Sequence, residues 1–174
     1  MGDDARGVGV LDLSIVDKAF VIRRIIEQLD GELSRYERSA RAAHAEATDE
    51  QSKAENKYDT RGLEASYLAR GQSKQFAEVL EAREQYAALP VRLFEPKDPV
   101  DIGALVEVEM DGEKEFYFIG PRAGGVEIVD DGRTVLVITP QSPLGQQLAG
   151  KRAGDKLHIR LGGRARKCRV ISVE

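Results

Sequence analysis

The sequence predicts an α+β protein in which an N-terminal antiparallel coiled-coil hairpin precedes a small antiparallel sheet domain with one short helix. All 6 prolines lie at or after Pro90, so the first half can form long uninterrupted helices. After Asp101 the hydrophobic period changes from helical to two, which is typical of strands. Aromatic residues make up only 6% of the chain, a composition that suits a thin coiled coil beside a modest core. We therefore place the hairpin at residues 13–89 and the sheet domain at residues 100–174.

The first helix is predicted from about Leu13, where Ser14 can cap it with Asp17 three residues on. A coiled-coil seam with alternating spacings of four and three follows, formed by Ile22, Ile26, Leu29, Leu33, Tyr36, Ala40, Ala43 and Ala47. A helix of roughly 35 residues spans roughly 50 Å at 1.5 Å per residue. The hairpin is therefore expected to be a rod.

The predicted tip of the rod is acidic. Residues 48–58 read TDEQSKAENKY and bring Asp49, Glu50 and Glu55 together in a short turn, with Asp59 next to it. The second helix then follows over about 54–89, with a less regular seam of Leu63, Ala65, Leu68, Gln72, Phe76, Val79 and Tyr86. Taken alone, the acids also fit a solvated turn beside a helix N-terminus, where negative charge is favourable.

The second half is predicted to be a sheet domain that follows a proline-rich linker over residues 90–101. Asp-Gly pairs at 111–112 and 131–132 indicate hairpin turns. Strands are expected at 104–110, 115–119, 126–129, 134–139, 156–161 and 167–173. Ser142 and Pro143 begin a short helix, and Gly150 ends it.

Composition excludes several classes of function. The 26 basic and 30 acidic side chains give a formal charge of −4, so duplex DNA binding is not expected. The chain has no apolar run long enough for a membrane span and no secretory signal, so we expect a cytoplasmic protein. Cys168 stands in a strand-like run without a partner and is interpreted as a buried structural thiol. Outside the tip, the sequence contains no nucleophile–base pair, phosphate loop or metal-ligand cluster, and we do not expect an enzyme.

Two segments carry a family resemblance. The run SPLGQQLAGKRAGD, residues 142–155, resembles the closing motif of the GreA/GreB family of bacterial transcription elongation factors. Glu55, Asn56 and Tyr58 resemble the tip signature of that family, Asp-x-x-Glu-Asn-x-x-Tyr. The order of parts is also similar, and the resemblance implies that the sheet domain is FKBP-like.

The resemblance implies a monomeric factor that binds bacterial RNA polymerase, reaches the RNA 3′ end through the secondary channel and stimulates cleavage of backtracked RNA. Asp49, Glu50 and Glu55 would be the acting acids, with Asp49 and Glu55 as ligands of a Mg²⁺ shared with the polymerase. Asn56 and Tyr58 would support the tip. The docking residues would be Ser142, Pro143, Leu144, Gln146 and Lys151.

The tip departs from the family pattern in two ways. Ser52 stands where the family has Asp, and only Lys57 separates Asn56 from Tyr58. Asp49 or Glu50 is the candidate replacement for the missing carboxylate. An alternative function is therefore a DksA-like regulator that occupies the channel without stimulating cleavage. A second alternative is an FKBP-type prolyl isomerase, for which Phe116, Tyr117 and Phe118 would have to line a pocket.

The remaining polar features have ordinary interpretations. Four cations, Arg164, Arg166, Lys167 and Arg169, alternate between the two faces of a strand and are interpreted as a solvated edge strand. His44 and His158 are far apart in sequence and have no partner at metal-ligand spacing. Neither histidine is given a functional role.

Overall fold

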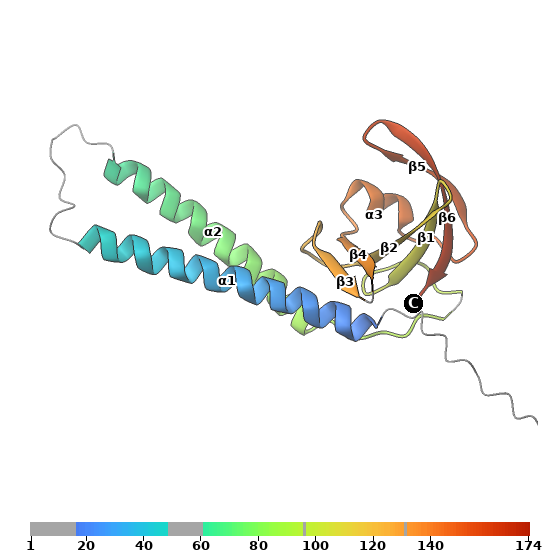
Figure 1. The fold of residues 1–174 in the computed structure, drawn as a ribbon, viewed down its shortest axis with the longest axis horizontal. Coiled ribbons are helices and arrows are strands. Elements are labelled where there is room, and N and C mark those ends of the chain that lie inside the picture. The colour runs from blue at the N-terminus through green and yellow to red at the C-terminus, as the bar shows by residue number, and fades with distance from the viewer. Residues whose placement is uncertain (1–16, 49–60, 96, 131) are drawn as a thin grey trace, which may run out of the picture.

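The structure is a computed structural model that describes residues 17–48, 61–95, 97–130 and 132–174. Two long helices, α1 (Lys18–Thr48) and α2 (Arg61–Ala87), form an arm that extends from a compact sheet domain (Figure 1). The 31 residues of α1 correspond to roughly 46 Å. Asp17 caps this helix, because its carboxylate accepts a hydrogen bond from the backbone N–H of Ala19 at 2.9 Å. The predicted cap Ser14 lies outside the described residues.

The second half of the chain forms a sheet whose strands are β1 (Leu105–Met110), β2 (Glu113–Ile119), β3 (Glu127–Asp130), β4 (Arg133–Ile138), β5 (Lys156–Leu161) and β6 (Arg164–Val173). Over the described residues the sheet is six-stranded, in the order β3-β4-β2-β1-β6-β5. The α+β fold class and the short helix α3 (Pro143–Leu148) are confirmed. The sheet is mixed rather than wholly antiparallel, because β2 and β4 run parallel. Strand β3 lies between β2 and β4 in the sequence and runs antiparallel to β4.

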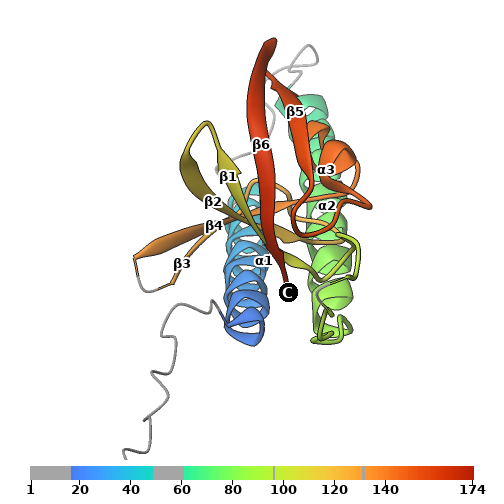
Figure 2. The same ribbon diagram turned by 90° about the vertical axis from the view of Figure 1, so that its right-hand side faces the viewer.

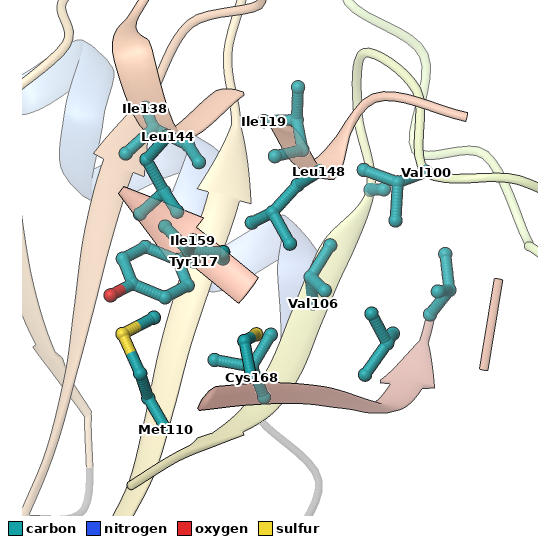
Figure 3. Close-up of a cluster of buried hydrophobic side chains, with 14 residues drawn as sticks. Val100, Val106, Met110, Tyr117, Ile119, Ile138, Leu144, Leu148, Ile159 and Cys168 are labelled. Atoms are coloured by element: carbon teal, nitrogen blue, oxygen red, sulfur yellow. The ribbon is translucent and has the colours of Figure 1, made fainter. Parts of the chain in front are cut away.

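One hydrophobic core lies between the sheet and α3. Leu144 and Leu148 of α3 point among side chains from β1, β2 and β6, including Val106, Tyr117 and Cys168 (Figure 3). Alternation along β2 sends Tyr117 into this core and its neighbour Phe118 into another. The sheet is therefore covered on both of its faces.

The second core joins the arm to the sheet. At the base of the arm, four residues of α1 are 0–8% exposed, namely Val21, Ile22, Ile25 and Leu29. They pack with Ala82 and Tyr86 of α2 and with the sheet residues Leu105, Phe118, Ile128, Val135 and Val137. Figure 2 views the molecule from the sheet end and shows both helices behind the sheet.

This core corrects the predicted seam. Val21 and Ile25 are fully buried but were not assigned to the seam, because they face the sheet in addition to the partner helix. Farther along the arm, Ala40 and Ala43 are exposed and Leu68 is 65% exposed, although the seam included all three. Among the described residues, no helix combines the length and the apolar character that crossing a membrane requires.

The linker between the two parts is held at several points. Backbone hydrogen bonds join Val100 to Lys151 at 2.7 Å and to Gly150 at 2.9 Å. The ammonium group of Lys18 donates to the carbonyl of Arg92 and lies 4.8 Å from the ring centroid of Phe94. Burial is the main cause that lowers the pKa of Lys18. The start of α1 is thus tied to the linker through a largely buried side chain.

Candidate functional site

The predicted tip residues Asp49, Glu50, Glu55, Asn56 and Tyr58 lie outside the described residues. The structure fixes the two helix ends that flank them, Thr48 and Arg61. Both ends lie at the pole of the arm opposite to the sheet (Figure 1). The chain segment that carries the acids therefore starts and finishes far from the sheet domain.

The middle of the arm has polar contacts between its helices. The hydroxyl of Tyr36 donates to Gln75 at 3.4 Å, and the guanidinium of Arg83 lies 3.1 Å from Asp30. A hollow of about 570 Å³ lies between the helices and is lined by Tyr36, Glu37, Ala40, Ala43, His44, Ala69, Gln72, Ser73 and Phe76. The hollow is open because the side chains at positions 40, 43 and 69 are those of alanine. The distal arm is consequently held less tightly than its base.

The start of α3 is constrained by three groups. The hydroxyl of Ser142 donates to the carbonyl of Thr139 at 2.8 Å and accepts from the backbone N–H of Gly145 at 3.0 Å. A Cβ on Gly145 would stand 1.9 Å from the Thr139 carbonyl oxygen, so no larger residue fits there without movement. The predicted capping by Ser142, with Pro143 in the first turn, is confirmed.

The predicted docking residues differ in exposure. Pro143 and Gln146 are exposed, whereas Ser142 and Lys151 are half-buried. Leu144 is 6% exposed and its side chain lies in the core beneath α3. Burial therefore assigns Leu144 to packing, and the surface that docking needs belongs to its exposed neighbours.

Residues 142–155, which contain α3, belong to a longer stretch of the chain that has known relatives. The family model described as "Transcription elongation factor, GreA/GreB, C-term" matches residues 95–174. Over residues 95–174 the chain is therefore similar to the C-terminal domain of the GreA/GreB family. The resemblance inferred from residues 142–155 is thereby confirmed.

A curated relative supports the same assignment. The "Transcription elongation factor GreA" of Aliarcobacter butzleri is 35% identical over 79 residues, which are 45% of this chain and 46% of that protein. The chain thus matches about half the length of this relative.

Solved structures of the GreA homologue Gfh1 resemble the chain more weakly. That of Thermus thermophilus is 21% identical, with a TM-score of 0.37, and covers 88% of this chain and 94% of its own. That of Thermus aquaticus is 20% identical, with a TM-score of 0.38, and covers 90% of this chain and 94% of its own. These likenesses add no argument about function.

Within residues 95–174, Arg166 organises a polar cluster. Its guanidinium lies 2.8 Å from Asp111 and 3.2 Å from Glu115, and the hydroxyl of Tyr117 donates to Glu115. The pKa of Asp111 is lowered mainly by the hydrogen bond from Arg166, and to a smaller extent by the one from the backbone N–H of Lys167. These contacts tie the β1–β2 turn to β6, which is a structural role.

Cys168 is a structural thiol, as predicted. It is 3% exposed, and burial raises the pKa of its thiol to about 11. Since the thiolate is the reactive form, this cysteine is inert at neutral pH.

The basic cluster around Cys168 is not on an edge strand. Strand β6 lies between β1 and β5, and the edge is formed by β5. The expectation was wrong because sequence periodicity does not order the strands within a sheet. The predicted sharing of faces is confirmed, since Cys168 is buried while its neighbours Lys167 and Arg169 are exposed.

In the described part of the chain, no three His, Cys, Asp or Glu side chains gather in a way that could hold a metal ion. The acids assigned to Mg²⁺ from the sequence, Asp49 and Glu55, lie outside that part. As oxygen donors they have the chemistry that Mg²⁺ prefers.

Proposed function

We propose that this protein is a transcription elongation factor that binds bacterial RNA polymerase through its C-terminal domain. Its arm would enter the secondary channel, and its tip would stimulate cleavage of backtracked RNA by the polymerase. The single observation that carries the proposal is the match of residues 95–174 to the C-terminal domain of elongation factors. In the proposed role the protein is a cytoplasmic monomer.

The geometry of the arm supports this role. Its base is buried in the sheet domain, so a docked domain would set the direction in which the arm points. The helices end at Thr48 and Arg61, on the far side of the molecule from α3. Beyond the buried base, residues 30–48 of α1 span roughly 28 Å at 1.5 Å per residue, so a domain bound at the surface of a partner could deliver residues 49–60 to a site of about that depth.

The tip acids would act through charge and oxygen ligation. Asp49 and Glu55 would add carboxylate oxygens around a Mg²⁺ of the polymerase, and Glu50 would add negative charge beside them. Such an ion stabilises the attacking and leaving oxygens of an in-line displacement. Asn56 and Tyr58 would hold the turn in position. Since the reacting centre belongs to the polymerase, the chain itself would not be an enzyme.

A second candidate function is favoured by the composition of the tip. Ser52 replaces a family carboxylate, and the spacing between Asn56 and Tyr58 is one residue short. Fewer carboxylates bind Mg²⁺ more weakly. The chain could then act as a channel-occupying regulator, similar to DksA-like factors, without stimulating cleavage.

The prolyl isomerase alternative requires the three aromatic side chains of β2 to line one pocket, and they do not. Tyr117 belongs to the core beneath α3, whereas Phe118 belongs to the core shared with the arm. Phe116 is half-buried on the same side as Phe118. The three aromatic side chains of β2 therefore do not converge on one pocket, and no activity of this type is proposed.

The deciding experiment compares transcript cleavage in purified stalled elongation complexes with and without the protein. We expect stimulated cleavage by the wild type and at least a tenfold loss in the variant Asp49→Ala, Glu55→Ala. The matched control is Glu32→Ala, Glu37→Ala, which removes two acids from the side of α1 and should retain activity.

Binding to polymerase is measured in parallel by competition. Normal binding of the wild type without stimulated cleavage would support the channel regulator instead. Absence of binding by the wild type would refute both functions.

A further inference from the structure

The strands β5 and β6 form a ribbon with one strongly basic side. Alternation places Lys156, His158 and Arg160 of β5 on the same side as Lys167 and Arg169 of β6. All five side chains are exposed. We call this set the cationic face.

The arrangement of the cationic face is unfavourable for the isolated protein. In the register of the ribbon, Lys156 stands opposite Arg169, and His158 stands opposite Lys167. Like charges directly opposite each other, as Lys156 and Arg169 are, destabilise an antiparallel pair. The sequence could have alternated the charges here, as it does where Lys114 of β2 forms an ion pair with Glu107 of β1 at 2.7 Å.

The acids nearby neutralise the face only in part. Asp111 is already held by the guanidinium of Arg166 at 2.8 Å and by the backbone N–H of Lys167 at 3.0 Å. Glu109 stands opposite Arg169 on one side but opposite Lys114 on the other. Among the described residues, none of the five members of the cationic face is in an ion pair.

The shape and chemistry of the face indicate the type of partner. A hollow of about 760 Å³ lies here, lined by members of both rows together with Glu109 and Asp111. The core of a protein–protein interface is apolar and poor in lysine, but the two rows present Lys, Arg and His around Ala165, with Glu109 and Asp111 at the border toward β1. Nucleic-acid interfaces are polar and much more positively charged.

We propose that the cationic face binds the phosphate backbone of a single-stranded nucleic acid. Within a row, successive cations are about 6.6 Å apart, twice the rise per strand residue, and the two rows are about 4.8 Å apart. Such a narrow double row accommodates one backbone lying along the ribbon. The face offers no aromatic side chain on which bases could stack, so the contacts are with phosphates and do not depend on sequence.

The position of the face makes this binding independent of the arm. Strand β5 is at one edge of the sheet, and β3, the strand next to α1, is at the other. Figure 1 shows the β5–β6 ribbon extending on the side of the domain away from the helices. A polynucleotide on the ribbon and the tip in a deep channel would therefore be engaged at separate places. Binding of a polynucleotide to the ribbon does not require the arm to have the proposed role.

The test is fluorescence anisotropy of the full chain with a labelled single-stranded RNA and DNA 20-mer over a range of salt concentrations. The test variant is Lys156→Gln, Lys167→Gln, Arg169→Gln. The control is Arg35→Gln, Arg70→Gln, Lys74→Gln, which removes three exposed cations from the arm. Circular dichroism of each variant confirms that it is folded.

We expect the test variant to bind at least tenfold more weakly at low salt. Each lost phosphate contact lowers the slope of log affinity against log salt by about 0.7, so the slope should fall by about 2. The control should bind like the wild type. Equal weakening in both variants would overturn the proposal, as would undetectable binding by the wild type. Displacement of the RNA by polyglutamate at equal charge concentration would identify an acidic protein as the partner and would also overturn it.

Discussion

Removing the ring of Tyr86 should destabilise the arm and the sheet together. Tyr86 is 0% exposed, and its hydroxyl donates to the carbonyl of Arg122 at 2.8 Å. Its ring centroid lies 6.5 Å from that of Phe118. A Cβ on Gly120 would stand 1.9 Å from the Tyr86 hydroxyl, so the pocket is shaped around this side chain.

The size of the effect follows from these contacts. Truncation of a large buried aromatic to alanine costs about 3–5 kcal/mol, which we expect for Tyr86→Ala. For a chain of this size, each kcal/mol lowers Tm by about 2–4 °C, so Tm should fall by roughly 6–20 °C. Tyr86→Phe keeps the ring and loses one hydrogen bond, at a cost of about 0.5–1.5 kcal/mol.

The assay is urea unfolding followed by circular dichroism for the helices and by the NMR amide signals of strand residues for the sheet, because only Tyr117 of the 5 tyrosines lies in a strand. Tyr67→Ala is the matched control, because Tyr67 lies on the same helix but is 66% exposed and should change stability by only about 0.5 kcal/mol. If Tyr86→Ala costs less than about 1 kcal/mol, the shared core is not what holds the arm. Loss of the helical signal alone, at an unchanged sheet midpoint, would refute the coupling.

Three further predictions concern single sites. Gly145→Ala should lose about 2 kcal/mol or more in urea unfolding, because its Cβ would clash with the Thr139 carbonyl at 1.9 Å; a wild-type midpoint would contradict this account of α3. Arg83→Gln should change stability by less than about 1 kcal/mol, since its ion pair with Asp30 at 3.1 Å is 39% and 48% exposed, and a larger loss would mean that this pair anchors the arm. Burial raises the pKa of Cys168 from 9.0 to about 11, so the thiol of the unfolded chain ionises at a lower pH than the thiol of the folded protein. The stability that depends on the neutral thiol is therefore complete below pH 9.0 and is lost as the pH rises toward 11. Unfolding at a series of pH values should therefore show a shallower alkaline decline for Cys168→Ala than for the wild type, and equal declines would contradict the shift.

The sequence allowed the elements to be predicted well but not their long-range packing. Strand β5 was predicted with the bounds that the structure gives, because Lys156–Leu161 alternates between glycine-containing turns. The parallel pairing of β2 with β4 has no comparable local signal. It depends on β3 folding back as an outer strand, and adjacent segments of a chain do not encode which strands become neighbours.

The seam shows the same limit. A heptad pattern assumes that a helix faces one partner, and Ile22 and Leu29 obey it. Val21 and Ile25 lie on the adjoining side of α1, in a core to which both α2 and the sheet contribute. Toward the distal end the pattern continues in alanines, but Ala40 and Ala43 bury little because the opposite helix does not close over them. Periodicity therefore identified the helix without identifying what covers it.

The candidate tip could be proposed only from composition and resemblance, since its acids do not form a chemical constellation that elementary reasoning recognises. A turn rich in Asp and Glu is also what a solvated helix end requires. The structure adds the location of the two flanking helix ends, Thr48 and Arg61, which lie at the distal pole of the arm.

The distribution of burial along the arm connects its fold to the proposed role. The first turns of α1 are sealed between α2 and the sheet, with Val21 and Ile25 both 0% exposed, whereas Ala40 and Ala43 border an open hollow. Segments with few buried contacts open at low free energy, so the stability of the arm decreases from its base outward. A rigid base with a loosely packed distal half can be aimed by the docked domain and still adjust its shape to the walls of a narrow site. A uniformly well-packed arm would need a shape already complementary to that site. The alanines that line the hollow together with Tyr36 and Phe76 favour the adjustable arm instead.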